Sequence, residues 1–305
     1  MRRAICVGIL CLSIFLTSCH RENLSAVSAS APVTAPAPDA RVAELRTILD
    51  RLIAARAAST NEEAEMIYDA LGERLAALPR AGIVTALDQA AGDDKRRQKE
   101  TIEVLSYLAD LPDAAERVGR ALRDPDPEVR ATAAQAVGNH KLTQYASLLN
   151  PLMAADPDSF VRICAITSAG AMKEPVNFPV LLSLGDVPGV LPALAGYGQP
   201  AARSFFEKIF QDSTRNRTDL VFAAWGLAKL GDRKAHAYLV TMLDDPPSTT
   251  HEDGVTIQDP GVSLRAAEAL CEVHGWDCNN PPIDIENFVP RVKERIRQLG
   301  TAPTP

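Results

Sequence analysis

Few residues in this chain have the type and spacing that catalysis or metal binding requires. Of the five histidines, His140 falls on a position that is leucine in a related segment, so we expect a structural role for it. His236 and Tyr238 are two residues apart and belong to different faces of a helix. The motifs His-Glu-x-x-His, Cys-x-x-Cys and Gly-x-Ser-x-Gly do not occur, and the Gly-Tyr-Gly run that begins at Gly196 lacks the helix signature of a phosphate loop. We therefore predict no catalytic residue, no cofactor and no bound metal.

An acidic insertion near residues 244–259 contains several oxygen ligands and one imidazole. These side chains are Asp244, Asp245, His251, Glu252, Asp253 and Asp259. Their spacing does not match the regular ligand pattern of a calcium loop. We therefore predict a solvated acidic loop rather than a metal site.

The cysteines indicate export rather than catalysis. Cys19 follows a positive start, Met1-Arg2-Arg3, and an apolar stretch over residues 4–16 that is too short to span a bilayer as a helix. The Leu-Thr-Ser-Cys run that ends at Cys19 resembles the bacterial lipobox. That resemblance implies cleavage before Cys19 and attachment of a diacylglycerol to its thiol. An ordinary secretory peptide with a chance cysteine is the alternative.

The lipobox resemblance implies a lipid-anchored protein of the bacterial cell envelope. Residues 1–18 would be the signal peptide. His20 stands where an aspartate would favour retention in the inner membrane of a Gram-negative bacterium, so the outer membrane, facing the periplasm, is favoured. Residues 19–39 are rich in Ser, Ala and Pro, and we predict a disordered tether that reaches roughly 60 Å when fully extended.

Two further cysteines are candidates for a disulfide. Gly275 is of the kind that ends a helix, and the prolines at 281 and 282 prevent an early resumption. We predict that the chain reverses near Gly275 and that Cys271 pairs with Cys278, which an exported compartment permits. Two unpaired thiols are the alternative. Cys164 lies in an apolar segment, and we expect it to be inert.

Composition and charge exclude several classes of partner. The chain has 305 residues, of which 46% are hydrophobic and 23% charged, a globular composition. A formal net charge of −7 and an aromatic content of 5% argue against nucleic-acid binding and against polybasic docking on a membrane surface. We expect another protein as the partner, and membrane attachment through the lipid anchor only.

An internal repeat organises most of the chain. The segment Asp124-Pro-Asp-Pro-Glu-Val-Arg130 aligns without a gap with Asp156-Pro-Asp-Ser-Phe-Val-Arg162, 32 residues later. Ala133-Ala134 follows in the first copy and Ala165-Ile166 in the second, and the pattern returns with paired alanines near Ala223 and Ala266. Each Asp-Pro ends one helix and begins the next. This spacing predicts helix pairs that stack as repeats.

The pattern resembles the HEAT repeat, in particular the alanine-rich variety found in phycobilisome lyases. The resemblance implies an all-α fold, a right-handed α-solenoid of HEAT-like helix pairs over residues 81–275. Helical caps are expected at residues 40–80 and within residues 276–305, beside a loop and a tail. The resemblance also implies a ladder between neighbouring repeats, in which the turn aspartate and the arginine six residues later take part. The ladder residues here are Asp124, Arg130, Asp156 and Arg162.

Six helix pairs are expected, at residues 81–110, 113–140, 142–172, 176–197, 200–231 and 233–274. Prolines and glycines between Pro188 and Gly198 predict a kink or an irregular second helix in the fourth pair. The sixth pair contains the insertion, residues 246–258, between its two helices.

The leading functional hypothesis is a protein-binding module: an adaptor, an assembly factor or a toxin-neutralising protein. Stacked helix pairs form a long concave surface that suits proteins better than small molecules. Repeat register selects these candidates on that face: Gln135, Asn139, Thr167, Trp225, Lys229, Glu268 and Glu272. The alternatives are a structural envelope scaffold without one specific partner and a lyase-like enzyme. The repeat family implies the enzyme, but chromophore attachment is cytoplasmic and this chain carries an export signal.

Overall fold

A computed structural model describes residues 38–58, 80–246, 248–252, 255–259, 261–277 and 285–301. The chain divides into two compact units, Met1–Asn177 and Phe178–Pro305, here called the first and second units. The boundary falls inside the expected repeat region 81–275. The expected signal peptide, Cys19 and the tether lie outside the described residues.

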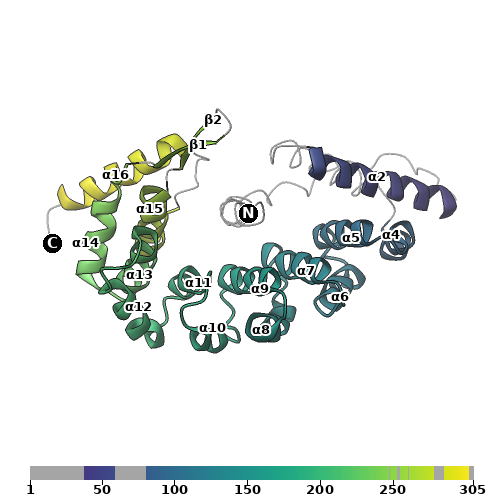
Figure 1. Cartoon of the computed structure of the whole chain (residues 1–305), viewed down its shortest axis with the longest axis horizontal. Coiled ribbons are helices and arrows are strands. Elements are labelled where there is room, and N and C mark those ends of the chain that lie inside the picture. The colour runs from purple at the N-terminus through teal and green to yellow at the C-terminus, as the bar shows by residue number, and fades with distance from the viewer. Residues whose placement is uncertain are drawn as a thin grey trace. The chain divides into compact units, whose positions relative to one another are not determined.

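The first unit is a stack of helix pairs. Helix α2 lies across α4 and α5, and the second helices of successive pairs, α5, α7 and α9, pack side by side (Figure 1). The elements are α2 (Pro38–Ala58), α4 (Ile83–Ala91), α5 (Lys95–Tyr107), α6 (Pro112–Ala121), α7 (Pro127–Asn139), the 3-10 turn η2 (Thr143–Tyr145), α8 (Ala146–Ala155) and α9 (Ser159–Met172).

The repeat period is visible in the way the second helices begin. Asp94, Asp126 and Asp158, spaced 32 residues apart, are the N-caps of α5, α7 and α9. Each carboxylate accepts a hydrogen bond from a backbone N–H of the first turn, which stabilises the start of the helix. The sequence therefore specifies these boundaries locally.

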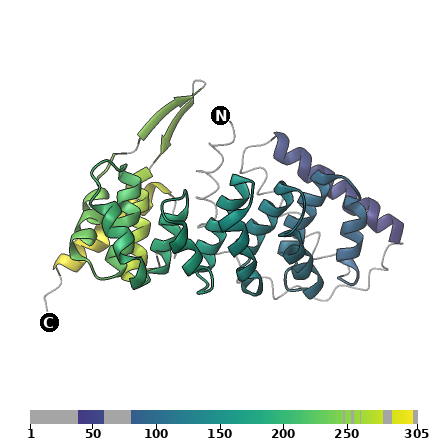
Figure 2. The same ribbon diagram turned by 60° about the horizontal axis from the view of Figure 1, so that its bottom comes forward.

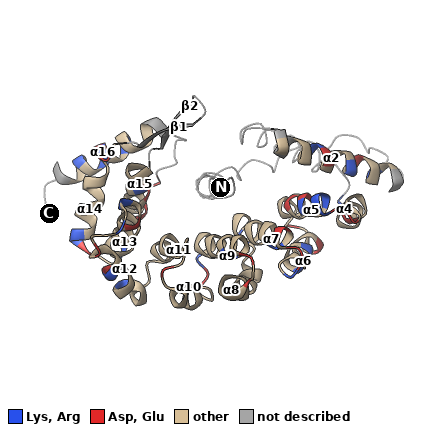
Figure 3. Cartoon of the chain, viewed as in Figure 1, with Lys and Arg blue, Asp and Glu red and all other residues tan. Residues whose placement is uncertain are grey.

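Small residues let α7 and α9 approach closely. Ala133, Ala134 and Ala165 are fully buried. A Cβ added at Gly138 would lie 2.7 Å from the Cα of Ser168, so the two helices are in backbone contact there. Helices α7, α9 and α11 carry few charges, which agrees with interior positions in their own units (Figure 3).

The second unit continues the pairs and adds a hairpin and a terminal helix. Its elements are α10 (Phe178–Leu184), α11 (Val190–Tyr197), η3 (Pro200–Ala202), α12 (Arg203–Phe210), α13 (Arg217–Lys229), α14 (Arg233–Met242), β1 (Ser248–Glu252), β2 (Val255–Asp259), α15 (Gly261–His274) and α16 (Ile285–Thr301). Helix α13 packs between α11 and α15, and α16 packs on α15.

Within the described ranges the α-solenoid fold is confirmed: all six expected helix pairs are present, and the β1–β2 hairpin is the one departure from helix. The weakness expected in the fourth pair is real: α11 has only 8 residues and is bounded by Gly189 and Gly198, with φ of 88° and 61°. Of the two expected alternatives, a kink or an irregular second helix, the structure shows a short second helix that Pro192 does not interrupt. Pro192 is the third residue of α11, where its missing N–H would have had no partner in the helix.

The insertion of the sixth pair, expected to be a solvated acidic loop, contains a β-hairpin that was not predicted. Strands β1 and β2 form an antiparallel hairpin in which Ser248 pairs with Asp259 and Glu252 with Val255. The hairpin extends away from the helices of the second unit (Figure 2). Its sequence supplies β-branched residues on both sides of Asp253-Gly254, and an Asp-Gly pair is a strong hairpin signal.

Candidate functional site

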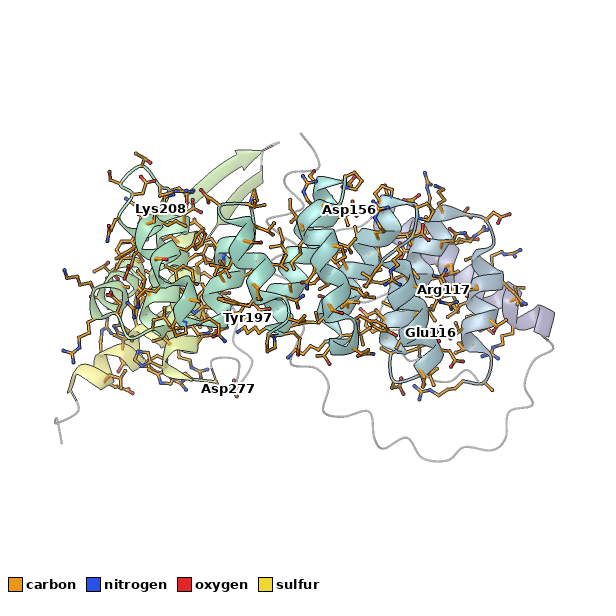
Figure 4. The ribbon with its side chains drawn as sticks, turned by 90° about the horizontal axis from the view of Figure 1, so that it is seen from below. Glu116, Arg117, Asp156, Tyr197, Lys208 and Asp277 are labelled. Atoms are coloured by element: carbon orange, nitrogen blue, oxygen red, sulfur yellow. The ribbon has the colours of Figure 1, made fainter. Side chains whose placement is uncertain are left out.

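The ladder residues meet at the turn between α8 and α9, where Asp156 lies (Figure 4). Arg130 Nε and Nη2 donate to the two carboxylate oxygens of Asp156 at 2.8 and 2.9 Å. Arg130 Nη1 also donates to the carbonyl oxygen of Asp124 at 2.8 Å. One arginine therefore joins its own turn to the turn of the next repeat.

Asp156 is ionised within the protein in spite of its burial. Its residue is only 6% exposed, and burial alone would raise the pKa of its carboxyl. Hydrogen bonds from Arg130 and from the backbone N–H of Asp158 outweigh that effect and hold the pKa below its usual value. The pair is thus a bidentate ion pair of the kind that fixes geometry.

The ladder does not continue into the repeat on either side of the Arg130–Asp156 ion pair. Arg162 donates to the carbonyl oxygens of Asp156 and Pro157, and it has no carboxylate partner within the described part of the chain. Pro188 stands 32 residues after Asp156, where the next aspartate would be. On the other side, Gln98 replaces the arginine and donates to the carbonyl oxygen of Gly92.

The candidates of the first unit lie on two adjacent helices. Gln135 and Asn139 belong to α7 and Thr167 to α9; Asn139 is exposed and the other two are half-buried. Asn139 is close to an exposed aromatic that the sequence analysis missed. Tyr107 is 47% exposed and stands 32 residues before Asn139, so extending the repeat backwards would have found it.

Tyr107 is part of a surface at the C-terminal ends of α5, α7 and α9. Its ring contacts His140 edge-to-face with a centroid distance of 4.9 Å. His140 is half-buried, as expected for a structural histidine. Lys141 and Lys173 follow α7 and α9, are exposed, and share left-handed φ angles of 49° and 56°. We call Tyr107, Asn139, His140, Lys141 and Lys173 the Tyr107 surface.

The candidates of the second unit come together, but as internal contacts. Trp225, a candidate for the concave face, is only 6% exposed, so its ring packs inside the second unit. Lys229 Nζ lies 5.6 Å from the centroid of that ring. It donates to Gly196 O at 2.7 Å and to Glu272 Oε2 at 3.0 Å. Lys229 therefore ties α11, α13 and α15 to one another.

Glu268 belongs to the same packed region of α15. Its carboxylate accepts a hydrogen bond from Arg265 Nη1 at 3.2 Å. Burial raises the pKa of Glu268, and the nearby charge of Glu272 adds to that effect. The repeat register selected residues that contact one another in the structure. It did not distinguish residues that hold neighbouring helices together from residues that could bind a partner.

The cysteines agree with their expected surroundings without settling the pairing. Cys164 is buried in α9. Gly275, with φ of 64°, ends α15, and the Trp276 N–H donates back to Cys271 O at 2.9 Å. Cys278 lies outside the described residues, so the Cys271–Cys278 bridge stays a prediction.

The described ranges also bear on metal binding and on membrane insertion. They contain no cluster of three or more His, Cys, Asp or Glu side chains that is placed to hold a metal ion. None of the helices in those ranges is both long and apolar enough to cross a membrane.

The fold and these contacts define a HEAT-like helical-repeat protein. The HEAT-repeat family model matches residues 83–170 and 115–191. No curated protein sequence matches the chain.

Three solved structures are similar to the chain at low sequence identity. A chain of the CpcE–CpcF complex of phycocyanin lyase from Nostoc is 17% identical, with a TM-score of 0.48 over 72% of this chain and 95% of that one. YibA of Escherichia coli is 16% identical, with a TM-score of 0.48 over 90% of this chain and 100% of that one. Human deoxyhypusine hydroxylase, in complex with glycerol, is 17% identical, with a TM-score of 0.29 over 86% of this chain and 97% of that one.

Proposed function

We propose that this protein is a lipid-anchored envelope protein whose helical repeats bind another protein. The observation that carries the proposal is the Tyr107 surface of the first unit. Most large apolar side chains in this unit are buried, and among the described residues Tyr107, Phe160 and Val176 are the exposed ones; Tyr107 is the one that ends a second helix of the repeats. Exposed tyrosines are frequent anchors in protein interfaces because they bury a large area at a low entropic cost.

The charge of the surface suggests the chemistry of the partner. Lys141 and Lys173 lie at equivalent places in successive repeats, and both are exposed. Two cations in register after α7 and α9, together with an exposed aromatic at the end of α5, favour an acidic segment that also presents apolar side chains. An extended segment of that kind would contact the ends of α5, α7 and α9 in turn.

The sequence before residue 40 supplies the anchor in this proposal. Lipidated Cys19 would hold the chain to the envelope, with the outer membrane favoured, and the tether would let the repeats meet partners away from the lipid surface. A structural scaffold without one specific partner remains the second candidate. Such a scaffold would not need an exposed aromatic at one defined place.

Site-specific cross-linking tests the binding surface. A photoreactive amino acid in place of Tyr107 should cross-link one defined envelope protein in intact cells. The same amino acid in place of Phe160 is a matched control, because Phe160 is an exposed aromatic at 42% but begins α9 rather than ending a helix. Lys141→Glu combined with Lys173→Glu should lower the Tyr107 cross-link at least about tenfold. Equal products from both positions would favour the scaffold.

Substitution of Cys19 tests the anchor separately. Cys19→Ala should abolish incorporation of labelled palmitate and leave unprocessed or soluble protein, since the lipid has no other attachment point in the proposal. Cys11→Ala, within the expected signal peptide, should retain the label. A Cys19→Ala protein that is still processed and recovered with membranes would refute lipidation while leaving the Tyr107 surface untouched.

A further inference from the structure

The sixth helix pair contains a pair of facing histidines. A long insertion that includes β1 and β2 separates α14 from α15 in the sequence, so no short turn ties these two helices together. His236 of α14 and His274 of α15 face each other with their Nε2 atoms 2.9 Å apart. Their rings are nearly perpendicular, at 84°, with a centroid distance of 5.1 Å.

We propose that His236 and His274 form a two-histidine site for a divalent transition-metal ion that clamps α14 to α15. Imidazole nitrogen is the preferred protein ligand of Zn²⁺, Cu²⁺ and Ni²⁺. Zinc–nitrogen bonds are about 2.0–2.1 Å long, which places two tetrahedral ligands roughly 3.3 Å apart. A separation of 2.9 Å reaches that value by small rotations of two side chains, without movement of either helix.

The surroundings hold one imidazole ring in place. His274 stacks on Trp276 with a centroid distance of 4.5 Å and an interplanar angle of 13°. The guanidinium carbon of Arg295, from α16, lies over the Trp276 ring, 5.5 Å from its centroid. Both histidines are partly exposed, so an ion has access and water can complete its coordination.

Protonation also favours ligation near neutral pH. Burial lowers the pKa of His274, and the neighbouring His236 lowers it further. The neutral imidazole is the ligating form. Without metal, one Nε2 donates to the other. On binding, a neutral donor ring shifts that proton to its own Nδ1, whereas a protonated donor ring, which already carries a proton on Nδ1, releases it to water, and both Nε2 lone pairs then face the ion.

The site contains two protein ligands, and this number sets its expected affinity and its expected preference among metal ions. The described residues provide no third His, Cys, Asp or Glu for it, so water would occupy the remaining positions and the affinity would be modest. Cu²⁺ should bind more tightly than Zn²⁺ or Ni²⁺ at a site of this kind. Arg295, the charged group that faces the stack from α16, adds a mild repulsion.

Thermal unfolding of the purified, chelator-treated full chain tests the clamp. At pH 7.5, saturating Cu²⁺, Zn²⁺ or Ni²⁺ should raise the melting temperature by about 3 °C or more, because an ion that binds only the folded state stabilises it. His236→Ala and His274→Ala should each remove the shift. His140→Ala, at a histidine of the first unit, should retain it.

A direct binding measurement tests the site even if a variant is too unstable to unfold cooperatively. Equilibrium dialysis with Cu²⁺ at pH 7.5 should show that His236→Gln lowers the affinity at least about tenfold, while His140→Gln binds as the unmodified chain does. Lowering the pH to about 5.5 should release the ion as the imidazoles gain protons. The proposal is overturned if none of the three ions shifts the melting temperature, or if the shift and the binding persist in His236→Gln.

Discussion

Replacement of Arg130 by alanine is expected to lower the free energy of unfolding by about 3 kcal/mol. The substitution removes both hydrogen bonds to a carboxylate whose side chain is only 4% exposed. A buried charge without its partner is costly because water cannot replace the lost bonds. Denaturant unfolding followed by circular dichroism measures the loss.

Arg162→Ala is the matched control for this prediction. Arg162 occupies the same place in the next repeat and makes the same contacts to its own turn carbonyls, but within the described residues no carboxylate completes its rung. The expected loss is below about 1 kcal/mol, that of ordinary hydrogen bonds at a partly exposed site. Equal losses for the two variants would show that the bond to Asp156 contributes nothing.

The Arg130 effect should also depend on pH. The pKa of Asp156 is lowered in the folded state, so the unfolded chain binds more protons in acid, and the stabilisation is fully present above the unfolded pKa of about 3.9. It is lost as the pH falls through the folded pKa. The difference between the unmodified chain and Arg130→Ala should therefore shrink steadily below about pH 4.

The helix pairs could be predicted because their signals are local. Asp94, Asp126 and Asp158 recur every 32 residues, and each caps a helix through its own first turn. Such a cap depends on a few consecutive residues and not on the rest of the fold. The hairpin was missed because β1 and β2 are short, and the acidic composition of the insertion suggested an irregular loop.

Burial and long-range pairs could not be predicted in the same way. Register selected Trp225, Lys229 and Glu272 as candidates on one face, yet it does not say how far a neighbouring helix covers them. His236 and His274 are 38 residues apart and are separated by the hairpin, so no repeat offset relates them. Tyr107 is a different case, because the 32-residue offset from Asn139 was available in the sequence.

Alanine at Gly138 should destabilise the first unit by about 2–3 kcal/mol, although alanine is the better helix former by about 1 kcal/mol. The added Cβ would lie 2.5 Å from Ser168 Oγ and 2.7 Å from Ser168 Cα. A side chain can rotate away, but the Cα belongs to the backbone of α9. Helices α7 and α9 must therefore separate, which disturbs the alanine packing between them.

Gly119→Ala distinguishes this backbone contact from an ordinary clash. At Gly119 the three atoms nearest the added Cβ are ring atoms of Tyr145, the closest at 2.5 Å. Tyr145 is half-buried and can turn aside. The gain in helix propensity should offset most of that cost, so this variant is expected within about 1 kcal/mol of the unmodified chain. Ser168→Gly added to Gly138→Ala should restore only part of the stability, because the Cα of residue 168 remains in place. Full restoration in denaturant unfolding would mean that the serine side chain, and not the approach of the two backbones, sets the distance between α7 and α9.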